Sequence, residues 1–110
     1  MSILELNSET SDGVVRVALV GELDIGSAPA LESELDRVER DRPAMIALDL
    51  RRLEFLDSTG LRVLLEADAR GKEMGRRVVI VRGPSAVQRV LAITRLDERL
   101  DLVDAPPSSA

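Results

Sequence analysis

The chain has 110 residues and a formal net charge of −5, which is the length of one ordinary domain with an excess of acidic side chains. It contains no cysteine or histidine, which excludes disulfides and the usual zinc sites. The acidic charge argues against binding to nucleic acid, and the single aromatic residue argues against base stacking. No apolar run approaches the ~20 residues that span a bilayer, so we expect a cytoplasmic protein that does not engage membranes.

Two segments rich in branched apolar residues open the chain, at residues 3–9 and 14–21. They flank Ser11-Asp12-Gly13, and an Asp-Gly pair between two such runs predicts a β-hairpin. A helix is expected to begin after Ser27, a residue type that caps helix N-termini, and to end before Pro43.

The second half of the chain alternates short apolar runs with amphipathic segments. The run at 44–50 predicts a central strand that is covered on at least one face. A second helix should run from near Ser58 to between residues 71 and 75. Three further elements are expected: a buried strand at 78–81, a helix after the turn at 83–85, and an edge strand at 100–103.

This order of elements predicts an α/β fold. Strands that alternate with helices indicate right-handed crossovers and parallel strand pairs, while the opening hairpin adds an antiparallel pair. We therefore expect a mixed sheet of four to five strands. The domain should occupy residues 1–104, and residues 105–110 should form a flexible C-terminal tail.

The sequence offers little catalytic chemistry. A Ser-His-Asp triad needs a base that this chain lacks, and neither glycine-rich phosphate-binding loop is present. Ser58 with Lys72, the sole lysine, leaves one serine–lysine pairing open. Asp57 could be the phosphorylated aspartate of a response-regulator receiver. That design also needs an acidic pair after the first strand and a lysine after the last strand, and neither is present, so we reject it.

The segment 55–61, Phe-Leu-Asp-Ser-Thr-Gly-Leu, joins a predicted strand to a predicted helix. In one interpretation Asp57 or Ser58 simply caps the helix. However, Gly60 in the first helical turn costs roughly 0.5–1 kcal/mol relative to alanine, which indicates that another group approaches the backbone closely there. A hydroxyl at a helix N-terminus is also a place where the helix dipole and free amides would stabilise an added phosphate.

Two motifs give the sequence a family resemblance. Asp57-Ser58-Thr59-Gly60-Leu61, preceded by Phe55-Leu56, resembles the phosphorylation-site motif of STAS-domain anti-sigma-factor antagonists. Gly21-Glu22-Leu23-Asp24, followed by Ala28-Pro29-Ala30-Leu31, is similar to that family's segment between the second strand and the first helix. The motifs have the family's order and separation. The resemblance therefore covers nearly the whole chain and implies a STAS-like domain with amphipathic helices packed mainly on one face of the sheet.

The resemblance implies a bacterial partner switch in which this protein is a ligand and a substrate, not an enzyme, and has no cofactor or metal. The unphosphorylated protein would bind an anti-sigma factor that is itself a serine kinase, and so release the sigma factor. The kinase, using ATP, would phosphorylate Ser58 and abolish binding, and a separate phosphatase would remove the phosphate. The free protein is expected to be a monomer. The alternative is a STAS accessory module of a lipid-transport or other transporter system, also without enzyme activity.

The same resemblance implies a partner-binding surface around Ser58. Within it, Asp24 is a loop acid that we expect to serve recognition and not stability. The resemblance implies that this surface includes Glu22, Asp24, Asp57, Thr59 and Gly60, and one side of the following helix, with Arg62 and Val63, is expected to extend it.

Apolar residues occupy two sides of the second predicted helix. One side carries Leu61, Leu64, Leu65 and Ala69, and roughly the opposite side carries Val63, Ala67 and Met74. A helix of this kind is either buried on both sides or offers one side to a partner.

Overall fold

The fold begins with the hairpin that Asp12-Gly13 predicts. The computed structural model describes residues 3–107, in which β1 (Leu4–Ser11) pairs antiparallel with β2 (Val14–Leu23). Asp12 and Gly13 have φ values of 51° and 79°. Two successive positive φ angles are what a tight two-residue hairpin turn requires, because they match the twist of the strands.

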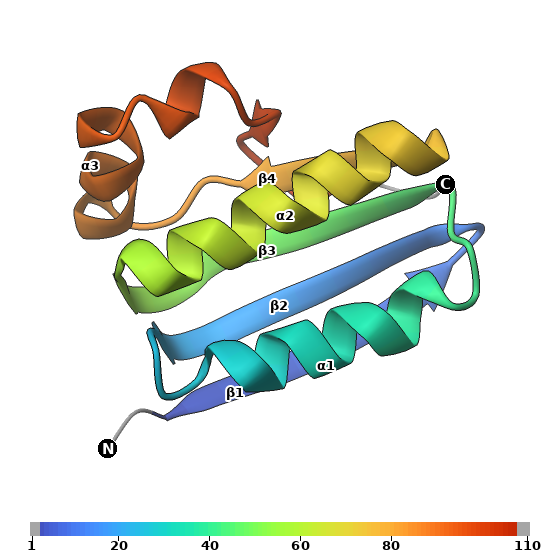
Figure 1. Cartoon of the computed structure of the whole chain (residues 1–110), viewed down its shortest axis with the longest axis horizontal. Helices are drawn as coiled ribbons and strands as arrows, with labels where there is room; N and C mark the ends of the chain where they lie inside the picture. Colours follow the sequence, from blue (N-terminus) through green and yellow to red (C-terminus); the bar gives the residue numbers. More distant parts are fainter. Residues whose placement is uncertain (1–2, 108–110) are drawn as a thin grey trace.

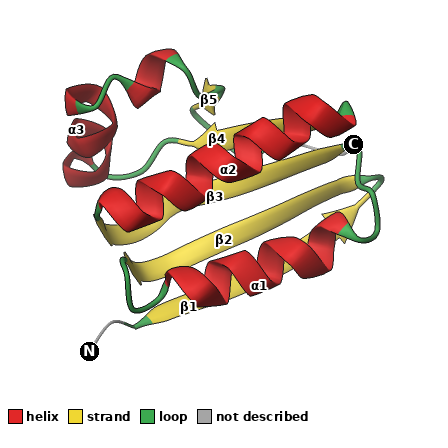
Figure 2. Cartoon of the chain, in the orientation of Figure 1, coloured by secondary structure: helices red, strands yellow, loops and turns green. Residues whose placement is uncertain are grey.

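The remaining elements build a five-stranded mixed sheet in the order β1-β2-β3-β4-β5. All pairs after the opening hairpin are parallel. Figure 1 and Figure 2 show α1 and α2 side by side on one face of this sheet. The elements after the hairpin are α1 (Ala28–Glu39), β3 (Met45–Leu56), α2 (Ser58–Met74), β4 (Arg77–Val81), α3 (Ser85–Ile93), a 3-10 turn (Leu96–Glu98) and β5 (Leu102–Val103).

One aliphatic core lies between the sheet and the helices. All three α-helices contribute buried side chains to it, among them Leu35 of α1, Leu64 of α2 and Leu91 of α3. They pack on alternate residues of the central strands, such as Leu48 and Ile80. The predicted α/β class, the mixed sheet and the helices on one face are confirmed.

Strand β3 is longer than its sequence pattern predicts. It continues through Leu56, whereas the apolar run indicates an end at Leu50. Two irregularities in the pairing with β2 each place an extra residue on β3. As a result the core-facing residues beyond Asp49 are three apart, at Leu50, Leu53 and Leu56, and the pairs between them face outward.

Gly60 allows the first turn of α2 to pack closely against the sheet. A Cβ at this position would lie 2.7 Å from Leu56 Cδ1, 2.8 Å from Leu23 Cγ and 2.9 Å from the Leu23 carbonyl oxygen. The close approach expected at Gly60 therefore occurs, and the approaching groups belong to the ends of the chain's own strands. The first turn of α2 rests directly on the last residues of β2 and β3.

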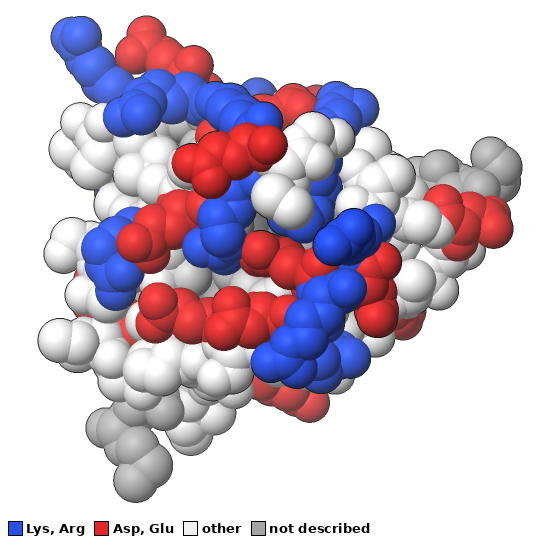
Figure 3. All heavy atoms as spheres, turned by 45° about the vertical axis from the view of Figure 1, so that its right-hand side comes forward, with Lys and Arg blue, Asp and Glu red and all other residues white. Residues whose placement is uncertain are grey.

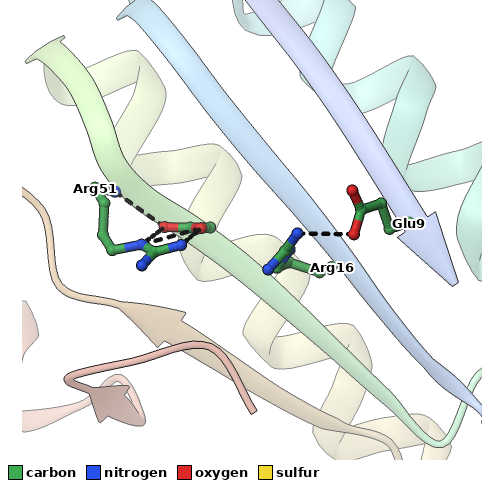
Figure 4. A network of polar contacts seen from close by, with 4 residues as sticks. Glu9, Arg16 and Arg51 are labelled. Atoms are coloured by element: carbon green, nitrogen blue, oxygen red, sulfur yellow. Dashed lines mark hydrogen bonds and ion pairs between the residues drawn. The ribbon is translucent and has the colours of Figure 1, made fainter. Parts of the chain in front are cut away.

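The face of the sheet opposite the core carries charged pairs (Figure 4). Arg16 donates to Glu9 at 2.7 Å, and Arg51 donates from Nε and Nη2 to the carboxylate of Asp49 at 3.0 and 2.9 Å. Burial raises the pKa of the Asp49 carboxyl, but the hydrogen bonds from Arg51 outweigh it and hold this pKa below its ordinary value. Asp49 is thus a buried but well-compensated acid.

The C-terminal end of the chain follows β5. Pro106 and Pro107 are partly buried, and residues 108–110 of the predicted tail lie outside the described residues. None of the helices within 3–107 combines the length and apolarity that a membrane span requires.

Glu34 of α1 links the helix to the edge strand and makes stability pH-dependent. Hydrogen bonds from Arg37 first, and from Ser8 of β1 second, lower the pKa of Glu34 from 4.5 to about 2. Because the folded state holds the lower pKa, the ionised carboxylate stabilises the fold above pH 4.5, and this contribution is lost as the pH falls toward 2. Glu34→Gln should therefore flatten the dependence of the unfolding free energy on pH across that window.

The measurement is denaturant unfolding at a series of pH values. Glu32→Gln is the matched control on the same helix, since its carboxylate makes only a long ion pair of 3.9 Å with Arg62. Equal pH slopes for the two variants would contradict the prediction.

Candidate functional site

The ends of β2 and β3 bring together the two sequence motifs. Leu23 pairs with Leu56 in the parallel ladder, so the residues that follow them, Asp24 and Asp57, leave the sheet at the same edge. The Asp57 N–H donates to the Leu23 carbonyl at 3.2 Å and holds the two chain segments together. This is the carboxyl edge of the parallel strands, where open α/β sheets usually bind their ligands.

Ser58 is the first residue of α2 and is exposed. Asp57 is the N-cap, and its Oδ1 accepts a hydrogen bond from the Gly60 N–H at 3.0 Å. The first helical bond of α2 runs from the Leu61 N–H to the Asp57 carbonyl. The N–H groups of Ser58 and Thr59 come before this bond and therefore lie at the positive end of the helix dipole, beside the Ser58 hydroxyl.

The loop between β2 and α1 is fixed by its own polar side chains. Asp24 Oδ1 accepts from the N–H groups of Gly26 and Ser27, at 3.0 and 3.2 Å. The Ser27 hydroxyl donates to the Glu22 carbonyl at 2.7 Å and accepts from the Asp24 N–H at 3.0 Å. Ser27 thus stands at the N-cap of α1, but its side chain braces the loop and makes no cap bond to the helix. Asp24 also has a structural role, which corrects the expectation that it serves recognition alone.

Four acidic side chains belong to the two segments that meet at this edge. Glu22, Asp24 and Asp57 are partly exposed, and Glu54 is exposed. Arg62, the nearest cation along α2, donates to Glu66 at 2.7 Å and lies 3.9 Å from Glu32, so its charge is already paired. The edge therefore presents negative potential that would favour a basic partner.

A hollow of about 300 Å³ adjoins Glu22 on the outer face of the sheet. Its lining contains three carboxylates and few donors. Within residues 3–107, however, no three acidic side chains converge closely enough to hold a metal ion. The lining residues are Ile3, Glu5, Val20, Gly21, Glu22 and Glu54.

The serine–lysine pairing left open by the sequence is excluded by helix geometry. Ser58 begins α2 and Lys72 lies in its last turn. At 1.5 Å per residue, these residues are separated by about 21 Å along the helix axis. Lys72 instead forms an ion pair with Asp68 at 3.1 Å. Lys72 is therefore too far away to activate the Ser58 hydroxyl as a nucleophile.

Two residues of the expected binding surface are buried. Val63 is only 1% exposed and belongs to the hydrophobic core, and Gly60 is enclosed by Leu23 and Leu56. Ala67 is also buried, so both apolar sides of α2 are largely covered, and only Ala69 and Met74 among the seven predicted apolar positions are exposed. The assignment of Val63 to a partner surface is wrong for its side chain, whereas Arg62 is exposed beside Ser58.

Two large apolar side chains are exposed at the site. Phe55, which lies two residues before the cap of α2, belongs to the motif and is 49% exposed. Ile25 in the β2–α1 loop is 76% exposed and was missed in the sequence analysis. Large apolar side chains at a polar edge are typical of protein contacts. The signal for Ile25 was present in the sequence, as an isoleucine within the otherwise polar or small stretch 24–27.

Comparisons with known proteins agree with this geometry. An anti-sigma-F factor antagonist of Mycobacterium tuberculosis, RsfB, is 34% identical over 94 residues, which cover 83% of this chain and 74% of that protein. The crystal structure of an anti-sigma factor antagonist from Mycobacterium paratuberculosis is 36% identical, with a TM-score of 0.81, and the match covers 94% of this chain and 87% of that one.

The fold is also shared with a more distant protein, SpoIIAA, described as an anti-sigma factor antagonist. Its unphosphorylated form has a TM-score of 0.75 at 19% identity, with 92% of this chain and 88% of that chain covered. Its phosphorylated form, from Bacillus, has a TM-score of 0.69 at 18% identity and covers 92% and 91% of the two chains. The family model described as STAS domain matches residues 5–106. This chain therefore belongs to the STAS domain family.

Proposed function

We propose that this protein is an anti-sigma-factor antagonist whose binding surface is the carboxyl edge of the sheet and whose switch is phosphorylation of Ser58. The single observation that carries the proposal is the exposed Ser58 hydroxyl at the first position of a helix, between two loops that present acidic and apolar side chains. The relatives named as antagonists favour this role over that of a transporter accessory. The partner is an anti-sigma factor with serine-kinase activity.

The chemistry of the site fits a substrate of a kinase and not an enzyme. Ser58 has no lysine within reach along its own helix, the chain has no histidine or cysteine, and the Oδ1 of the neighbouring Asp57 is occupied by the Gly60 N–H. A kinase brings its own base and ATP, and needs only an accessible hydroxyl. A separate phosphatase then returns the protein to the binding form. We place this cycle in the cytoplasm, with the free protein as a monomer.

A phosphate on Ser58 would lower the affinity for the partner and leave the fold of the free protein largely unchanged. It would add about −1.5 to −2 charges beside the first amides of α2, where the helix dipole favours an anion. Asp57 and Glu54 would oppose it at short range, so we expect no newly ordered segment. In a complex the same group would have to lose its hydration against a packed surface, which is strongly unfavourable without a partner cation.

Substitutions at Ser58 test the switch. Ser58→Ala should bind the anti-sigma factor as the unphosphorylated protein does and should resist the kinase, so the sigma factor stays active. Ser58→Glu should bind poorly, because a charge occupies the contact. Stoichiometric phosphorylation of the wild-type chain should weaken binding by about four decades, or about 5.5 kcal/mol, since that factor turns mostly bound into mostly free.

Thr59→Ala is the control for this series, because it removes the neighbouring hydroxyl and should still accept phosphate at Ser58. The measurements are the mass of the intact protein after treatment with kinase and ATP, and the affinity for the kinase before and after. Equal affinities, or phosphate on Thr59 alone, would refute the switch.

Two substitutions at Asp24 test whether its carboxylate serves partner recognition or the stability of the loop. Asp24→Ala loses an acceptor for two backbone N–H groups, and should lower the unfolding free energy by about 1 kcal/mol, as loss of a cap does. Asp24→Asn keeps an oxygen acceptor and should stay within about 0.5 kcal/mol of wild type, yet it removes a charge beside Ser58. We expect Asp24→Asn to reduce the rate of phosphorylation or the partner affinity. Asp24 would be purely structural if Asp24→Asn left the phosphorylation rate and the partner affinity unchanged. In that case any loss of either quantity in Asp24→Ala would follow from its lower stability.

A further inference from the structure

Arg76 is the buried cation of this fold. It follows α2 and precedes β4, and among residues 3–107 no other lysine or arginine is buried. Its side chain is 5% exposed. Two of its guanidinium nitrogens, Nε and Nη1, are shielded from solvent and find no hydrogen-bond acceptor within the described part of the chain. Buried donors without acceptors are unusual and costly.

The neighbouring acid forms an ion pair with Arg76 but accepts no hydrogen bond from it. Glu39 lies 3.6 Å from Arg76 Nη1, beyond hydrogen-bond distance. Both carboxylate oxygens of Glu39 already accept from Arg70, from Nε and Nη2 at 2.9 Å each. Glu39 is therefore shared between two guanidinium groups, and Asp36 and Glu73 line the same hollow. The C-terminal end of α2 attracts a cation through its dipole, but Arg76 Nε and Nη1 make no bond to a carbonyl there. What Arg76 lacks is acceptors for the Nε and Nη1 donors, and the oxygens of an added anion would supply them.

Two hollows meet at Arg76. One, of about 310 Å³, has only arginines as charged lining residues, Arg42 and Arg76, and an apolar remainder that includes Met74. The other, of about 400 Å³, shares Arg76 and Met74 but has a mixed lining of three acids and three arginines. Figure 3 turns this end of the molecule toward the viewer and shows basic and acidic side chains gathered over it. The first hollow is the one whose charge suits an anion.

The backbone at Arg42 follows the end of α1, and Arg42 lines the first hollow. Arg42 has a φ of 50°, in the left-handed region that glycine and asparagine occupy at lower cost. The conformation is held by a hydrogen bond from the Arg42 N–H to the Glu39 carbonyl at 3.0 Å. An arginine in this strained position supplies a guanidinium to the rim of the hollow, which glycine could not do.

We propose that Arg76 and Arg42 form an oxyanion-binding site, for a phosphate or carboxylate group, at the opposite end of α2 from Ser58. The planar guanidinium offers a fork of donors that matches two oxygens of such a group. The exposed Met74 side chain, which lines both hollows, moves aside to admit it. The site is independent of the proposed switch, because the 17 residues of α2 lie between them.

The test is a titration of the isotope-labelled full chain, followed by amide chemical shifts at constant ionic strength set with chloride. Sodium phosphate and sodium acetate are added in separate arms, which distinguish a phosphate from a carboxylate site. We expect at least one anion to give saturable shifts at residues 42–44 and 75–76, with a dissociation constant of about 1 mM or lower. Arg76→Met should weaken this binding at least tenfold, and Arg42→Met should weaken it several-fold.

Arg77→Met is the matched control. Arg77 is the next residue, is exposed, pairs with Asp101 at 3.0 Å and lines neither hollow, so this variant should keep the wild-type dissociation constant. Arg42→Met keeps the buried arginine and serves as the test if Arg76→Met does not fold. No saturable shift with either anion, shifts confined to Ser58 and Thr59, or full affinity in Arg42→Met would overturn the proposal.

Discussion

The site depends on the close packing of the first turn of α2 against the ends of β2 and β3. This packing is possible because residue 60 has no side chain, so that Leu23 and Leu56 can fill the space where a Cβ would be. The loss of helix propensity at Gly60, roughly 1 kcal/mol, is offset by this close contact between helix and sheet. The contact brings the N-terminus of α2 beside the β2–α1 loop, and thereby places Ser58, the loop held by Asp24 and the exposed Ile25 on one edge.

The two ends of α2 have opposite chemical character. At its start, an exposed hydroxyl lies beside free helix amides, and acidic side chains belong to the two segments that meet there. At its end, a buried guanidinium lacks acceptors and faces a hollow with a second arginine. The core cluster between them is made of aliphatic side chains, and the buried Asp49 lies on the opposite face of the sheet, where it pairs with Arg51.

Much of the fold could be predicted from the sequence because local signals agreed with tertiary packing. Asp12-Gly13 gave the hairpin, Pro43 lies just beyond α1, and Asp57 caps α2 where the motif indicates. The extension of β3 was missed because two bulges replace the period of two by a period of three, so Leu53 and Leu56 look like loop residues. Val63 was misplaced because burial on both sides of α2 depends on how α1 and β4 pack against it, which no helical pattern reveals.

The measurement that tests the central claim most directly is a map of the partner contact on the labelled chain. Amide chemical shifts would be recorded while the kinase-type anti-sigma factor of the same organism is added. The account predicts that the changes concentrate in residues 22–27 and 54–62, at the carboxyl edge of the sheet, and that residues at the far end of α2 keep their shifts. Changes centred on the outer face of the sheet around Asp49 and Arg51, with none near Ser58, would contradict it.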